Sequence, residues 1–263
     1  MFTLSAVGAL CVCAVMFALW RFSVLRNNFS YVDIAWAANF ALLAVIDGVL
    51  GEGYFPRRLL IGAMYGLAGV RLALHLSHRI VGHPEEGRYV QLRHDWGKDG
   101  HLNRNFLLFF QAQALLNLIL SVPMIVAVEN TTPRLHALEI AGAALWLVAF
   151  CGESIADRQL AAFKGIPANH GKVCDVGLWS VSRHPNYFFE WMIWVAYAVF
   201  AWASPRGWIA ILMPLLMLHF LLDVTGVKPT EAQALRSRGE SYRRYQQSVS
   251  VFFPWFPKHG VSR

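Results

Sequence analysis

The chain has 263 residues, of which 56% are hydrophobic and only 15% are charged, and its formal net charge is +7. Soluble proteins carry about 25% charged residues, so this composition excludes an ordinary water-soluble domain. Windows of about 20 mainly apolar residues are long enough to cross a bilayer. We therefore predict an all-α, polytopic membrane protein with one domain over 1–263 and seven transmembrane helices, at 2–20, 31–50, 59–76, 106–128, 135–152, 186–203 and 207–223.

The distribution of basic residues predicts the orientation of these spans. No basic residue precedes the first window, and Arg21 and Arg26 follow it, which favours a retained span over a signal peptide. With Met1 outside and the C-terminus in the cytoplasm, most Lys and Arg residues fall on the inner side, as the positive-inside rule requires. The outer loops then hold only Arg57, Arg58, Arg134 and Arg206. The inner charge can serve topology, anionic lipid or a phosphorylated ligand.

Three inner segments, 77–105, 153–184 and 224–263, are longer and more polar than the outer connections. A soluble ligand is therefore expected to approach from the cytoplasm. The four cysteines lack metal-ligand spacing and the scattered His83, His94 and His101 do not cluster, so we predict neither disulfides nor a metal site.

The second span opens with YVDIAW, which places Asp33 near Trp36 inside the membrane. A carboxylate at that depth needs a partner, and Arg71 or a histidine of the third span is expected to supply it. An interhelical ion pair and a catalytic role both fit this position.

The third span contains GVRLALHLSHR, in which Arg71, His75 and either His78 or Arg79 lie along one stripe of a helix. Ionisable side chains within a span face the bundle interior or a wet cavity rather than lipid. A lone histidine is usually structural, but several ionisable groups within two turns favour a site.

The fifth span ends in GESIADRQLAAFKG, where Glu153, Asp157 and Lys164 share a helix face if the helix continues past the membrane. One reading is a solvated helix end with an internal salt bridge. The other gives Asp157 to ribose or amide groups of a ligand and Lys164 to a phosphate.

The sixth span begins in SRHPNYFFE. Proline is favoured at the first position of a helix, so Pro185 should open the helix with His184 at its cap. The helix N-terminus beside Arg183 then favours an anion. Asn186 and Glu190, four residues apart, share a face one turn deeper.

The tail begins GVKPTEAQ, in which Thr230 and Gln233 after Pro229 predict a capping box and a helix start. Gly239 is expected to divide the helical segment. The tail can be an amphipathic helix lying on the membrane or a lid over a ligand.

The runs LWSVSRHPNYFFE, HLSHR and RGESYRRYQQSVSVFFPWF together resemble the steroid 5α-reductase superfamily, particularly its bacterial branch of membrane reductases. The resemblance extends from Asp33 to Trp255. It implies a seven-helix protein of the bacterial inner membrane that binds NADPH from the cytoplasm. It also implies reduction of a carbon–carbon double bond conjugated to a carbonyl in a steroid-like or other lipid substrate. Nothing in the sequence implies a nucleic-acid partner or an obligate protein partner.

The resemblance also assigns residues by matching position. The dinucleotide site would contain Asp157, Lys164, Asn186 and Glu190, flanked by Arg183, His184 and Tyr187 and closed over by Arg238, Tyr242 and Tyr245. His75, His78 and Arg79 match the family's histidine-and-arginine segment in the third span. We take Asp33, His75 and His78 as the candidate catalytic residues, and Trp36 and Arg71 as candidate substrate contacts.

Three positions depart from the family pattern. Leu76 stands where the animal enzymes have a tyrosine that polarises the substrate carbonyl. The animal enzymes also pair that tyrosine with a glutamate of an earlier span. In this chain the nearest candidate for that role is Asp33, and His75 could serve instead. Phe189 replaces the usual glycine of the HPNYFGE run.

Two other classes remain open. Membrane isoprenylcysteine methyltransferases share an RHP-x-Y segment and an aromatic, basic tail around S-adenosylmethionine, but they usually carry paired glutamates early in the tail, where this chain has the single Glu231. The Asn186 and Glu190 pair favours the reductases. A transporter or scaffold is the third class, although no inverted repeat is visible. Cofactor binding distinguishes all three.

Overall fold

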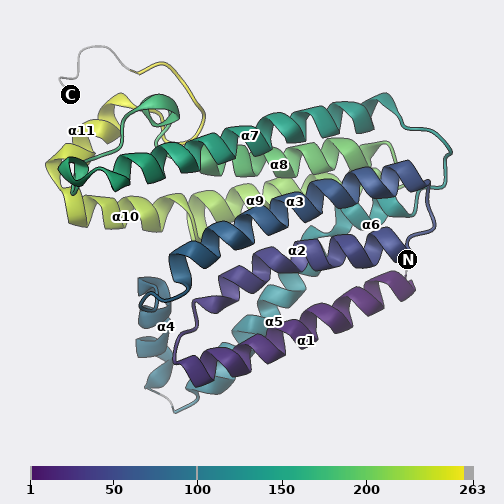
Figure 1. Cartoon of the computed structure of the whole chain (residues 1–263), viewed down its shortest axis with the longest axis horizontal. Coiled ribbons are helices and arrows are strands. Elements are labelled where there is room, and N and C mark those ends of the chain that lie inside the picture. The colour runs from purple at the N-terminus through teal and green to yellow at the C-terminus, as the bar shows by residue number, and fades with distance from the viewer. Residues whose placement is uncertain (1, 99, 258–263) are drawn as a thin grey trace. The chain divides into compact units, whose positions relative to one another are not determined.

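The computed structural model describes residues 2–98 and 100–257 (Figure 1). The elements within these ranges are all helical, which confirms the prediction of an all-α protein. Met1 and the end of the tail from residue 258, both part of the predicted topology, lie outside the described residues. The chain divides into an N-terminal unit, Met1–Glu139 with Phe200–Ile209, and a C-terminal unit, Ile140–Val199 with Ala210–Arg263.

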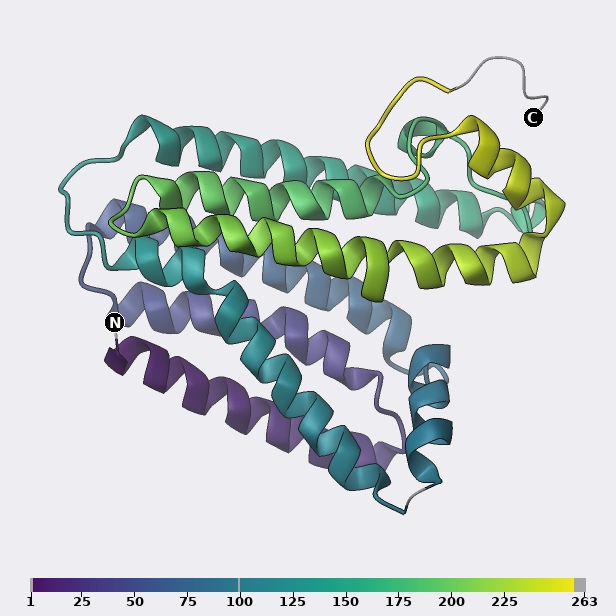
Figure 2. The ribbon, with the colours of Figure 1, turned by 180° about the vertical axis from the view of Figure 1, so that it is seen from behind.

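The N-terminal unit is built around three long helices. These are α1 (Phe2–Arg26), α2 (Tyr31–Leu50) and α3 (Phe55–Ile80), followed by α4 (Gly87–Gly97), α5 (Leu102–Leu120) and α6 (Val122–Val128). Helix α2 packs against α1 and α3, and α5 runs obliquely across α1 and α2 (Figure 2). The core includes Phe29, whose ring stacks on that of Phe106 with 3.6 Å between centroids.

Arg57 stabilises the start of α3 from inside the N-terminal unit. The sequence places it in an outer loop, but the third helix begins at Phe55, four residues before the predicted span, and the Arg57 side chain is only 1% exposed. It pairs with the buried Glu139 and donates to the backbone oxygens of Asn130, at 2.7 Å, and Arg134, at 2.6 Å. Arg57 therefore lies in the first turn of α3 rather than in a loop, and its charge is paired within the N-terminal unit.

Helices α5 and α6 form a bent pair with an angle of 43° between them. The bend falls at Ser121, two residues before Pro123. Proline lacks a backbone N–H and clashes with the preceding turn, so it interrupts a continuous helix. The single predicted span 106–128 is thus two helices.

The C-terminal unit contains three long helical segments that run side by side (Figures 1 and 2). They are α7 (Ala137–Gly165), α8 (Pro185–Trp202), and α9 (Leu212–His219) continued by α10 (Val227–Arg238). Short 3-10 turns, η1 (Pro167–Asn169) and η2 (Gly177–Ser180), lie between α7 and α8, and η3 (Gly207–Ile211) precedes α9. The π-helical turn η4 (Phe220–Val224) joins α9 to α10, and α11 (Glu240–Ser248) follows.

Length and hydropathy support a polytopic integral membrane protein. In the described ranges, five helical segments are long and apolar enough to cross a membrane, and the bent α5–α6 pair makes a sixth. They correspond to six of the seven predicted spans. The other predicted span, 186–203, is α8, which forms as a helix of 18 residues and is not among these candidates. Its first two turns carry Asn186 and Glu190, which lower its mean hydropathy.

Candidate functional site

The tail of the C-terminal unit folds as two short helices, α10 and α11. Gly239, at φ 55°, lies between them and divides the segment as predicted. Helix α10 begins at Val227, so Thr230 lies within its first turns and does not cap it. The predicted capping box was therefore wrong. The helix starts earlier because the residue before it is Gly226. Any side chain at this position would clash with the backbone oxygen of Leu221.

The apolar face of α11 is covered by other parts of the chain. Tyr242 and Tyr245 are buried in a cluster with Ala234 of α10 and Val249 after α11, and Val173 packs against the cluster from the loop before α8. An amphipathic helix lying on a bilayer would turn this face to lipid. The packing therefore favours the interpretation of the tail as a cover on its own unit.

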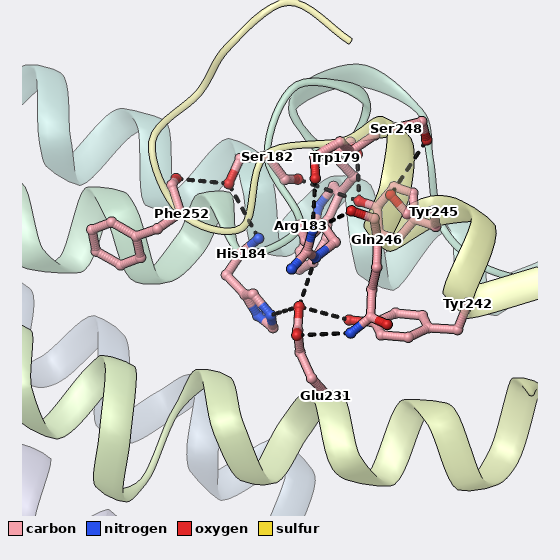
Figure 3. Close-up of polar contacts among 11 residues, drawn as sticks. Trp179, Ser182, Arg183, His184, Glu231, Tyr242, Tyr245, Gln246, Ser248 and Phe252 are labelled. Carbon is pink, nitrogen blue, oxygen red and sulfur yellow. Dashed lines mark hydrogen bonds and ion pairs between the residues drawn. The ribbon is translucent and has the colours of Figure 1, made fainter. Parts of the chain in front are cut away.

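Arg183, two residues before α8, is the centre of the contacts that hold the tail (Figure 3). Its Nε donates to Oε1 of Glu231 in α10 at 2.6 Å, and its Nη1 donates to the backbone oxygens of Gln246 and Val249 at 2.9 and 2.7 Å. The side chain is only 10% exposed. The sequence predicted an anion-binding role for Arg183, but the guanidinium is already paired with a carboxylate of the tail.

Glu231 receives most of the remaining polar contacts of this network. His184 Nε2 lies 3.3 Å from Oε1, Gln246 Nε2 donates to Oε2 at 2.9 Å, and the Tyr242 hydroxyl donates to Oε1 at 3.5 Å (Figure 3). We call Arg183, His184, Glu231, Tyr242 and Gln246 the Glu231 network. It joins the start of α8 to both tail helices by charged hydrogen bonds, which are stronger than neutral ones.

Backbone contacts fix the residues around this network. The Tyr245 hydroxyl donates to the backbone oxygens of Trp179 and Ser182, and the Ser182 hydroxyl donates to the backbone oxygen of Phe252 at 2.8 Å. Burial raises the pKa of Tyr245, and burial followed by the negative charge of Glu231 raises the pKa of Tyr242. Both hydroxyls therefore stay protonated and act as donors at neutral pH.

A second set of polar groups lies where α7 passes the start of α8. Asn186 Nδ2 donates to Oδ1 of Asp157 at 3.3 Å, so the structure brings together two residues that the sequence assigned to one site. Asn186 Oδ1 is buried and makes no hydrogen bond to another described residue. Buried polar oxygens in proteins are nearly always paired, so this amide oxygen is a place where a ligand donor would be accepted.

Two basic side chains, Lys164 of α7 and Arg238 of the tail, act on Cys174 in the segment between α7 and α8. Helix α7 continues to Gly165, as the site interpretation required, and carries the exposed Lys164. Arg238 at the end of α10 donates through Nε to the backbone oxygen of Lys172 at 3.0 Å. Burial raises the pKa of the Cys174 thiol, while the positive charges of Lys164 and Arg238 both oppose that rise. Lys164 and Arg238 both lie near enough to Cys174 to oppose that rise, whereas the negative charge of Asp175 adds to it.

The other predicted cofactor residues are placed on α8. Tyr187 stacks on His184, with 5.4 Å between ring centroids and 2° between planes, and its hydroxyl lies 3.4 Å from that of Thr230. Glu190 lies one turn beyond Asn186 and is partly buried. Pro185 is the first residue of α8, as predicted.

In the N-terminal unit, Asp33 is held by α4 rather than by α3. The Tyr89 hydroxyl donates to Asp33 Oδ1 at 2.6 Å, and Arg88 forms an ion pair with Oδ2. The expected partner, Arg71 or a histidine of the third span, was therefore wrong. The reason is that 77–105 is folded, with α4 reaching back over the start of α2. Burial, followed by the charge of Asp33, raises the pKa of Tyr89.

The remaining predicted residues lie along α2 and α3. Trp36 Nε1 is buried and makes no hydrogen bond to another described residue. Arg71 is partly buried, and His75 and His78 are exposed in the last turns of α3. Leu76 is 8% exposed and packs with Ala37 of α2, so it belongs to the helix interface. Within 2–98 and 100–257, no three His, Cys, Asp or Glu residues are arranged to hold a metal ion.

Comparison with known proteins gives the family. A family model described as a protein of unknown function, DUF1295, matches residues 19–249. The chain belongs to the DUF1295 family. No curated protein and no solved structure matches it.

The DUF1295 match covers both polar regions, from Asp33 through the Glu231 network to Tyr245. It ends at residue 249, before Phe252 and the aromatic end of the tail.

Three residues of these two polar regions could not be given a role from the sequence alone. Glu231 was noted only as a single acidic residue, although it is the one carboxylate in the run GVKPTEAQALRSR. Arg88 and Tyr89 gave no periodic signal, because they lie in a short amphipathic helix that is mostly polar.

Proposed function

We propose that this DUF1295 protein is an NADPH-dependent reductase that acts on a carbon–carbon double bond conjugated to a carbonyl in an apolar, lipid-like substrate. In this proposal the chain has seven spans in a bacterial inner membrane, with its N-terminus outside. The polar side of the C-terminal unit then opens to the cytoplasm. The proposal combines two observations. One is the resemblance of three sequence runs, and the other is the contact between Asp157 and Asn186.

The observation that carries the proposal is the contact between Asp157 and Asn186 beside an unpaired buried amide oxygen. A dinucleotide presents ribose hydroxyls and a carboxamide, which donate to such oxygens. Its phosphates need positive charge, and Lys164 and Arg238 supply it near Cys174. These residues fit NADPH, with Asp157 and Asn186 on the hydroxyl or amide groups and Lys164 on a phosphate.

The Glu231 network has a separate role in the proposal. Its charged groups are paired among themselves, so they are suited to fixing the tail in place rather than to gripping an anion. A tail held in this way would exclude water from a dinucleotide beneath it.

NADPH, when bound, would supply a hydride to the β-carbon of the substrate. The chain must then supply the proton for the α-carbon and a group that polarises the carbonyl. We assign this work to Asp33, His75 and His78. Tyr89 holds a proton on its hydroxyl against Asp33 Oδ1, so Asp33 and Tyr89 form a hydrogen-bonded acid pair. Trp36, with its buried indole N–H, and Arg71 remain the proposed substrate contacts.

Affinity for NADPH in detergent tests the cofactor assignment. Asn186→Ala should weaken binding about tenfold, the cost of one hydrogen bond, and Lys164→Ala by about ten- to a hundredfold, because it removes a charged contact. The matched controls are Asn103→Ala and Lys172→Ala, which change exposed residues of the same type. Unchanged affinity in both Asn186→Ala and Lys164→Ala would refute this site.

Methyl transfer from S-adenosylmethionine is the second candidate. One observation favours keeping it: the single tail glutamate, Glu231, does contact the RHP-x-Y segment through Arg183 and His184. Binding of S-adenosylmethionine without binding of NADPH would support this reaction instead.

A further inference from the structure

A shallow apolar groove of about 600 Å³ runs along α7. Its lining residues all belong to the C-terminal unit and include Leu147, Cys151 and Ile155 of α7, Phe189 of α8, and Leu178 of η2. The Phe189 ring rests against Gly152, where an added Cβ would lie 2.5 Å from the ring. Phe189, which replaces the family glycine, therefore forms part of the wall of the groove.

The groove has one polar side chain, and that side chain is already paired. Gln159 accepts a hydrogen bond from the backbone N–H of Leu178 at 2.8 Å. The apolar side chains are open to the surroundings, with Leu147 57% and Ile155 47% exposed. Because α7 is a membrane-span candidate, this exposed surface faces hydrocarbon when the protein is in a bilayer.

A cationic side chain, Arg158, lies on the same helix as the groove, next to the lining residue Gln159. Arg158 follows Cys151 by seven residues and Leu147 by eleven, so all three lie on one stripe of α7. It is exposed, and it makes no hydrogen bond or ion pair within the described ranges. From Leu147 to Arg158 the helix rises about 16 Å, close to half of a hydrocarbon core of about 30 Å.

We infer that this groove binds one anionic phospholipid of the bilayer, with an acyl chain along Leu147–Ile155 and the phosphate at Arg158. The groove is lined mainly by apolar side chains, and the rise of α7 from Leu147 to the cationic Arg158 matches about one leaflet of hydrocarbon. A neutral lipid would use the same apolar wall but lose the attraction of Arg158. That attraction is about 1 kcal/mol per basic residue near a membrane surface, which corresponds to about fivefold in affinity. This inference is independent of the proposed reaction.

Photolabelling in vesicles tests the inference. The full chain is reconstituted in phosphatidylcholine containing a small fraction of phosphatidylglycerol with a diazirine on one acyl chain, and labelled peptides are mapped by mass spectrometry. A phosphatidylcholine probe with the same chain is the reference. We expect the phosphatidylglycerol probe to label 147–155 about fivefold more than the reference does. The exposed face of α3 around Leu67 and Leu74 should show no such preference.

Two variants separate the head-group contact from the groove itself. Arg158→Gln should abolish the preference for phosphatidylglycerol, whereas Arg243→Gln, which changes an exposed arginine of α11, should leave it unchanged. Leu178→Trp should reduce labelling by both probes because it fills the groove.

Three results would overturn the inference. Equal labelling by the two probes in the unchanged protein would show that Arg158 selects no head group. Equal labelling of the groove and the α3 face would show only the general lipid shell. An unlabelled groove, with Cys151 of two copies forming a disulfide, would assign the surface to another protein copy, since Cys151 is exposed there.

Discussion

Replacing Glu231 by glutamine should release the tail from the C-terminal unit. The change keeps the side-chain shape but removes the charge that Arg183 pairs with, and turns one acceptor oxygen into a donor that faces the donors of Arg183 or Gln246. The side chains of Arg183 and Glu231 are only 10% and 15% exposed, so little solvent screens their ion pair. Removing one partner of a buried pair costs about 3–5 kcal/mol, and the residual exposure places this case at the lower end, about 3 kcal/mol.

Limited trypsin digestion in mild detergent measures this loss. Cleavage within α10 and α11 requires local opening, and its rate follows the free energy of opening when opening is fast. A loss of about 3 kcal/mol corresponds to about a hundredfold faster cleavage. The control is Glu240→Gln, which breaks a 3.6 Å ion pair between Glu240, 69% exposed, and Arg243, 68% exposed. Because this pair is open to solvent, the change should alter the cleavage rate less than about threefold. If Glu231→Gln were cut no faster than Glu240→Gln, the network would not be what holds the tail.

The other predictions concern packing, pH and catalysis. Gly152→Ala should force Phe189 aside, which costs about 1–3 kcal/mol of stability and lowers the thermal midpoint. Adding Phe189→Ala should restore part of the lost stability. An unshifted midpoint in Gly152→Ala would contradict the packing of Phe189 on Gly152. Because the pKa values of Tyr242 and Tyr245 are raised in the folded state, stability should be complete below about pH 10 and fall as the pH rises above it. Tyr245→Phe should therefore reduce the alkaline increase in tail proteolysis, and an identical pH profile would argue against it. Asp33→Asn should lower NADPH oxidation with lipid enones at least about a hundredfold while NADPH still binds, and normal turnover would give Asp33 a structural role.

Periodicity and composition predicted the helices well, because long apolar windows leave few alternatives to membrane helices. The all-α fold, the start of α8 at Pro185 and the break at Gly239 are confirmed, and α7 meets the condition that the fifth helix continue past the predicted span. Each depends on a local signal, such as a proline, a glycine or a helical repeat. The bend before Pro123 also had such a signal, but the span was predicted as continuous.

Partners of charged side chains could not be predicted in the same way. Asp33 pairs with Arg88 and Tyr89, more than 50 positions away, and Arg183 pairs with Glu231, 48 positions away. Such pairs depend on how loops fold back, which no local pattern encodes. The sequence identified Arg183 as chemically important, but only the structure shows that it stabilises the tail. For Asp157 and Asn186, the proximity that the resemblance implied is confirmed by their hydrogen bond, although Asp157 lies within α7 and not at its end.

A thermal shift of the purified chain in mild detergent measures the proposed binding of NADPH without any assumption about the substrate. NADPH and S-adenosylmethionine are compared at equal concentrations, with mass spectrometry of small molecules retained through purification. The reductase proposal predicts stabilisation by NADPH alone, by about 2.7 kcal/mol at a hundred times its Kd. Stabilisation by S-adenosylmethionine alone would contradict it and make SRHPNYFFE part of a methyl-donor site.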